Sequence, residues 1–217
     1  MNRQKVGINS DQNSKRKASN NLANWIQFKG GDDKAFAYLY KEYFHSLYNY
    51  GTKFTVDKEL VKDSIHDLFI NLRKYRSTLT SFTPDESNDA DPVKFYLYRS
   101  FRRILAGKLS ESHPALLTGD ILDNYHFQVT ISFEENLIIS ESRNWRINQL
   151  NKSLKKLPSR QKEAVYLRFY EGYSFQQIAE LMGSNNIKST RSLIYKALDN
   201  LRKHLEIHIS ALVFCLL

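Results

Sequence analysis

The chain has 217 residues, enough for one domain or two small ones, and its net charge of +9 favours polyanionic partners. A single cysteine, Cys215, excludes an intrachain disulfide and a multi-cysteine zinc site, which fits a reducing compartment. The longest apolar run, 207–217, is shorter than the roughly 20 residues that a membrane span needs. We therefore expect a cytoplasmic protein.

The first 20 residues are basic and polar, and they lack the apolar core of a secretory signal. They predict a disordered tail over residues 1–20. The prolines all lie outside the stretches whose apolar residues keep helical spacing, which favours an all-α protein. The first expected element is a short helix around Trp25, which ends before the Gly30–Gly31 pair.

Two long helices are predicted next. The first is capped by Asp32 or Asp33 and runs to about Phe54, with an aromatic and leucine stripe on one face. The second begins after Thr55 or Asp57 and runs to Tyr75. We expect the two to pack antiparallel, with the apolar positions of the second helix buried: Val61, Ile65, Leu68, Phe69 and Leu72.

The second of these helices also carries Glu59, Asp63 and Asp67 at four-residue steps, so that its outer face is acidic on a basic protein. DNA would repel this ridge. Either it contacts a partner other than DNA or it is a solvated face, and the spacing alone leaves both interpretations open.

A third helix is predicted from Asp91–Pro92, an N-cap followed by proline at the first helical position, to about Leu109. Aromatic residues alternate with basic ones along it, as single-strand binding requires. Some of these aromatics belong to the core: we expect Leu97, Phe101 and Ile104 inward, and Tyr96, Arg99 and Arg103 more exposed.

The composition between residues 110 and 140 is that of a linker, which divides an N-terminal helical bundle, 21–109, from a second helical domain, 141–206. Helical periodicity returns at about Glu141, breaks at Leu157–Pro158 and resumes to Lys203. The apolar tail, 207–217, either packs onto the second domain or docks a partner helix.

The second domain contains the pattern of a helix-turn-helix. A helix ends at Gly172, Ser174 and Gln177 form a capping box, and the small residue Ala179 allows close helix crossing. A turn over 183–186 leads into a helix with a basic outer face. Such a second helix fits the major groove of DNA and presents its N-terminal side chains to base edges. We expect these contacts from Lys188, Ser189, Arg191, Ser192, Tyr195 and Lys196.

The segment from Leu154 to Gly183, LKKLPSRQKEAVYLRFYEGYSFQQIAELMG, followed by STRSLIYKALDNLR, resembles region 4 of bacterial sigma factors. FKGGDDKAFAYLYKEYFHSLYNYG and VKDSIHDLFINLRKYR resemble region 2 of the same family. The two resemblances cover about residues 22–109 and 146–205 in the family's order. The chain is therefore similar to the extracytoplasmic-function (ECF) type of the sigma-70 superfamily.

The resemblance implies a transcription initiation factor without enzymatic activity. The second domain would read the duplex −35 element, and Tyr96, Arg99, Arg102 and Arg103 would hold the melted −10 strand. Asp63, His66 and Asp67 would bind the clamp helices of the largest subunit of core RNA polymerase. The implied partners are core polymerase, promoter DNA and a membrane-linked or soluble anti-sigma protein, with no small-molecule substrate.

Three departures from the family pattern bear on specificity. Arg103 and Gly107 stand where many relatives have Asn and Asp, which puts their usual −10 preference in doubt. The turn over 183–186 is one residue longer than usual.

No catalytic motif or phosphate-binding loop occurs, and no cofactor is expected. His204 and His208 lie four residues apart, but two histidines without a third ligand do not predict a metal site. Two other classes stay open: a helix-turn-helix regulator that binds operator DNA without polymerase, and a nucleic-acid-processing enzyme with an unrecognised active site.

Overall fold

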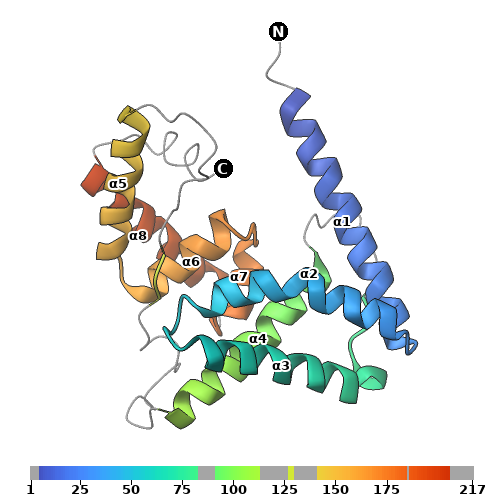
Figure 1. Ribbon diagram of the computed structural model, residues 1–217. Helices are drawn as coiled ribbons and strands as arrows, with labels where there is room; N and C mark the ends of the chain where they lie inside the picture. The colour runs from blue at the N-terminus through green and yellow to red at the C-terminus, as the bar shows by residue number, and fades with distance from the viewer. Residues whose placement is uncertain (1–4, 83–90, 113–126, 130–140, 185, 206–217) are drawn as a thin grey trace. The chain divides into compact units, whose positions relative to one another are not determined.

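Figure 1 shows the computed structural model of the protein. The structure describes residues 5–82, 91–112, 127–129, 141–184 and 186–205. Within these ranges every regular element is helical, which confirms the predicted all-α class. No helix in the described ranges has the length and apolar character needed to cross a membrane.

The chain divides into two compact units. Unit 1 comprises Met1–Thr52 and Asp57–Ser112, and unit 2 comprises Lys53–Val56 and His113–Leu217. The predicted linker, 110–140, and the predicted tail, 207–217, lie largely or wholly outside the described residues. Phe127 is an exception, because it is buried against the ring of Tyr166 in unit 2 with a centroid distance of 5.7 Å.

Unit 1 contains four α-helices and one short 3-10 helix among the described residues. Asp32 and Asp57 are the observed N-caps of its second and third helices, as predicted. Figure 1 shows these two helices side by side and running in opposite directions. The elements are α1 (Lys5–Lys29), α2 (Asp33–Gly51), α3 (Lys58–Lys74), η1 (Arg76–Thr78) and α4 (Pro92–Ser112).

The core of unit 1 lies between α2, α3 and α4, and all five apolar positions predicted for α3 are buried. Gly51 ends α2 next to side chains of α3 and α4. A Cβ atom at this position would lie 2.7 Å from Val61 Cγ1 and 2.8 Å from Phe101 Cζ, so only glycine fits.

The N-terminal segment differs from the prediction. Residues 1–20 were expected to be disordered, but α1 begins at Lys5 and continues to Lys29. Leu22, Trp25 and Phe28 anchor its C-terminal half in the core, and helix propagation from an anchored turn costs little per residue. Lys17 Nζ also contacts Glu42 Oε1 of α2 at 2.5 Å, which places a long-range ion pair within the segment expected to be disordered.

Unit 2 contains α5 (Glu141–Lys156), α6 (Ser159–Phe169), α7 (Phe175–Leu181) and α8 (Ile187–Leu205). The predicted break between its first two helices is observed, because α6 starts directly after Pro158. Helices α5, α6 and α8 share one apolar core, formed by Leu150, Leu154, Leu157, Val165, Ala197 and Leu201.

Candidate nucleic-acid interface

Helices α7 and α8 have the local geometry of a helix-turn-helix. Gly172 adopts φ 79°, the left-handed conformation expected after α6. Ser174 Oγ accepts a hydrogen bond from Gln177 N at 3.2 Å, and Gln177 Oε1 accepts one from Ser174 N at 2.9 Å, which completes the capping box. After α7, Gly183 with φ 64° allows Ser184 N to donate to Ala179 O at 2.7 Å.

The polar side of the N-terminal half of α8 is exposed to solvent. Asn186 Oδ1 accepts a hydrogen bond from Lys188 N at 2.8 Å, so the first turn is capped by a side chain. On the opposite side of the helix, Ile194, Ala197 and Leu201 are buried. The structure therefore exposes all six residues predicted to contact DNA: Lys188, Ser189, Arg191, Ser192, Tyr195 and Lys196.

The aromatic ring of Phe175 lies next to the exposed face of α8 and was not predicted from the sequence. The guanidinium carbon of Arg191 lies 5.2 Å from the ring centroid of Phe175, and that of Arg168 lies 4.9 Å from the same centroid. Arg168 also donates a hydrogen bond to Tyr173 O at 2.9 Å. These contacts orient Arg191, and they add Arg168 to the cationic residues of the surface. The sequence feature that could have indicated this contact is the aromatic residue Phe175 at the first position of α7.

The −10 residues predicted on α4 divide into two groups. Arg99 and Arg103 are exposed, and Tyr96 is half-buried. Arg102, by contrast, is only 7% exposed and lies in the interior, so the structure does not present it to nucleic acid. The sequence spacing already indicated this burial. Tyr98, Phe101 and Leu105 are all buried, and Arg102 lies on the same face of the helix, since the four residues occupy positions i, i+3, i+4 and i+7.

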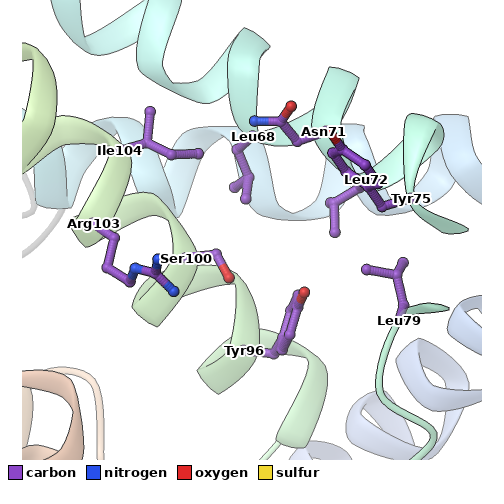
Figure 2. A pocket seen from close by; sticks show the side chains of 9 residues that line it. All are labelled: Leu68, Asn71, Leu72, Tyr75, Leu79, Tyr96, Ser100, Arg103 and Ile104. Carbon is purple, nitrogen blue, oxygen red and sulfur yellow. The ribbon is translucent and has the colours of Figure 1, made fainter.

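A cavity of about 550 Å³ lies in unit 1 between α3, α4 and the segment after η1. Figure 2 shows two of the predicted −10 residues, Tyr96 and Arg103, on the α4 side of this cavity. Its lining combines apolar side chains with hydroxyl, amide and guanidinium groups: Leu68, Asn71, Leu72, Tyr75, Leu79, Tyr96, Ser100, Arg103 and Ile104. This volume falls within the range of roughly 300–1,000 Å³ that is typical of small-molecule sites.

The start of α4 is held by a network centred on Asp91. Its Oδ1 accepts hydrogen bonds from Val93 N and Lys94 N, both at 3.1 Å, and thereby caps the helix. Its Oδ2 accepts from Tyr43 OH and from Asn21 Nδ2, both at 2.7 Å. Burial and the adjacent Asp91 carboxylate raise the pKa of Tyr43 far above its usual value, so the phenol remains a donor. Asp91 thus ties α4 to both α1 and α2.

The predicted polymerase-binding residues lie on the outer side of α3. Asp63 and His66 are exposed, and His66 Nε2 is 3.1 Å from Tyr40 OH. Asp67 is half-buried and pairs with Lys108 Nζ at 2.7 Å. The acidic ridge is therefore real, but its charge is partly neutralised by cations of the same unit.

The described residues contain no group of three side chains that could hold a metal ion. Of the histidine pair considered for metal binding, His208 lies outside the described residues.

Residues 147–201, which include α6, α7 and α8 up to Leu201, match the family model of sigma-70, region 4. This part of the chain is therefore similar to sigma-70 region 4. The match confirms the predicted resemblance for the helix-turn-helix half. None of the curated proteins compared with the chain matches it in sequence.

The chain also matches solved structures. One is CnrH in complex with the cytosolic domain of CnrY, which is 16% identical and has a TM-score of 0.53. The match covers 86% of this chain and 97% of CnrH. The likeness extends over both units, and at this level of identity it shows a shared helical fold.

Proposed function

We propose that the chain is an ECF-type sigma factor, which binds core RNA polymerase and directs it to specific promoters. The observation that carries this proposal is the region 4 match over residues 147–201, in which α8 exposes six polar or cationic side chains. Unit 1 supplies the two features that a factor of this kind needs besides duplex binding: a surface for polymerase and a site for unpaired bases.

The −35 element would be read by α8. A helix of this kind enters the major groove, and a guanidinium can donate two hydrogen bonds to guanine O6 and N7. Arg191 is the best candidate for that contact, because its guanidinium carbon lies 5.2 Å from the ring centroid of Phe175, and this contact orients the side chain. Lys188 and Lys196 suit phosphate contacts, which position the helix without reading sequence.

The melted −10 strand would be captured by α4 and the cavity. Strand capture requires a planar surface on which a base stacks and cations that follow the backbone. Tyr96 contributes an aromatic ring to the lining of the cavity, and Arg103 contributes a guanidinium group to the same lining. Exposed Arg99 extends the cationic track. The free energy of binding bases only when they are unpaired would offset the cost of unstacking them.

Core polymerase would bind the outer face of α3. Asp63 and His66 are exposed there, and Asp67 is oriented by Lys108 at its side. A cationic protein surface complements these carboxylates, whereas DNA is repelled by them. Within unit 1, the acidic face of α3 would therefore bind polymerase, and the basic residues of α4 would bind nucleic acid.

We further propose that the protein acts in the cytoplasm and is held inactive there by an anti-sigma protein. The support is indirect: CnrH, which shares the fold, has been solved with the cytosolic domain of CnrY. The acidic face of α3 is a surface that such a protein would have to cover in order to exclude polymerase.

In vitro transcription with core polymerase and a promoter library tests the proposal. The wild-type chain should yield transcripts that start at a common promoter sequence, and core enzyme alone should not. Arg191→Ala and Arg103→Ala should each abolish most of this signal, whereas Lys41→Ala, on an exposed position of α2, should not. Transcription that is equally strong without the chain would refute the proposal.

A further inference from the structure

We propose that the C-terminal end of α1 positions the strand-capturing cavity, and that Trp25 and Lys29 are the positioning residues. This inference rests on the proposed function, because it assigns to α1 a part in −10 strand capture. Neither residue lines the cavity, so each would act through the residues that do.

Hydrogen bonds from α1 hold the segment that forms one wall of the cavity. Leu79 lines the cavity directly after η1 and is shown at its edge in Figure 2. Lys29 Nζ donates to Leu79 O at 2.6 Å and to Ser81 Oγ at 2.7 Å. Trp25 Nε1 donates to Thr80 O at 3.1 Å. Residues 80–82 belong to no helix, so these side-chain bonds replace a backbone ladder.

The indole of Trp25 also fixes the ring that would stack on a base. Trp25 is fully buried, and its ring centroid lies 5.4 Å from that of Tyr96 and 5.5 Å from that of Phe82. Phe82 and Tyr96 are 6.0 Å apart, which closes a cluster of three rings. Tyr96 is therefore packed on one side while it lines the cavity on the other. A ring that is fixed before binding loses less conformational entropy when a base stacks on it.

The contribution of Lys29 to global stability is expected to be small. Its side chain is half-buried. Of its two acceptors, Ser81 Oγ is exposed, where water would serve it nearly as well, and Leu79 O lies in a part-buried position. Fixing a lysine side chain also costs conformational entropy. What the two bonds accomplish is to select one conformation of the 79–82 segment, since both acceptors belong to it.

The test compares full-length variants bound to core polymerase. Lys29→Met keeps the length of the side chain and removes its donors, and Lys41→Met is the matched control on an exposed position of α2. Each complex is titrated with a fluorescent single-stranded oligonucleotide that carries the non-template −10 sequence. Association with core, binding to −35 duplex and the thermal midpoint are measured in parallel.

Lys29→Met should weaken oligonucleotide binding about tenfold, because the 79–82 segment would adopt its binding conformation for a smaller fraction of the time, and leave the three parallel measurements unchanged. Lys29→Arg, which retains the charge and the donors, should restore most of the affinity. Trp25→Phe, which keeps an aromatic ring and removes the indole donor, should weaken oligonucleotide binding in the same direction.

Two results would overturn the inference, and they are distinguishable. If the wild-type complex binds the oligonucleotide and Lys29→Met binds it as well as Lys41→Met does, α1 has no positioning role and the proposed function survives. If the wild-type complex does not bind the oligonucleotide at all, strand capture by unit 1 is wrong and the inference falls with it.

Discussion

The two surfaces assigned to nucleic acid are built in opposite ways. The α8 surface in unit 2 comes from one continuous stretch, in which a capping box, a glycine turn and an amphipathic helix follow one another. The cavity in unit 1 is assembled from α3, the segment after η1 and α4, with α1 supporting it from behind. A rigid helix suits a rigid duplex, whereas an unpaired base needs a concave site that distant segments enclose.

This difference predicts where substitutions act. Damage to unit 2 should remain local to the substituted contact. Damage to unit 1 should spread where a residue connects three helices, as Asp91 does.

Asp91→Ala should destabilise unit 1 by about 3 kcal/mol, since it removes a helix cap and the acceptor of Tyr43 and Asn21. Chemical unfolding followed by aromatic fluorescence measures the effect. The control is Asp33→Ala, which breaks only an exposed pair with Arg73 and should cost less than about 1 kcal/mol. If the two substitutions lowered the free energy of unfolding equally, the bonds from Asp91 to α1, α2 and α4 would not have the proposed stabilising role.

Arg191→Ala should cost about 1–3 kcal/mol of promoter discrimination and leave the folding of unit 2 intact. Competition binding of the holoenzyme to duplexes that differ at single −35 positions measures it. Arg202→Ala, at an exposed position near the other end of the same helix, should change affinity without changing sequence preference. An unchanged base preference in Arg191→Ala would remove Arg191 from the reading of bases.

Ser174→Ala should lower the stability of unit 2 by about 1 kcal/mol through loss of the capping box. Thermal unfolding of the full chain measures this, and unit 1 should be unaffected. Gln176→Ala, an exposed neighbour in the first turn of α7, is the control. If Ser174→Ala destabilised the protein as much as Asp91→Ala does, the contrast between local contacts in unit 2 and long-range contacts in unit 1 would be wrong.

Lys196→Ala should weaken binding to all duplexes uniformly, by a few tenths of a kcal/mol up to about 1 kcal/mol at moderate salt. Its signature is a slope of log K against log salt that is smaller by about 1, which is measured by titration at several salt concentrations. A change in sequence preference with an unchanged slope would indicate a base contact instead.

The same contrast explains what the sequence could predict. The caps at Asp57 and Ser174, the turn at Gly172 and the exposed face of α8 depend on neighbours within a few residues, and all were predicted. The length of α1 was not, because the partners of its Lys17 and Asn21 side chains, Glu42 in α2 and Asp91 before α4, lie far along the chain.

The cavity could not be predicted for the same reason, because its wall at Leu79 and its ring at Tyr96 meet only through the tertiary fold. Arg102 is a different case. Its place in the apolar stripe of α4 was visible in the spacing, and a charge-based reading of that helix overlooked it.

The most direct test of the central claim is a mobility-shift experiment on a promoter duplex with and without core polymerase. The account predicts that the full chain alone binds the duplex weakly and that core enzyme plus chain forms a tight, promoter-specific complex. Tight and specific binding by the chain alone, with no gain from core enzyme, would contradict it and identify a regulator that acts without polymerase.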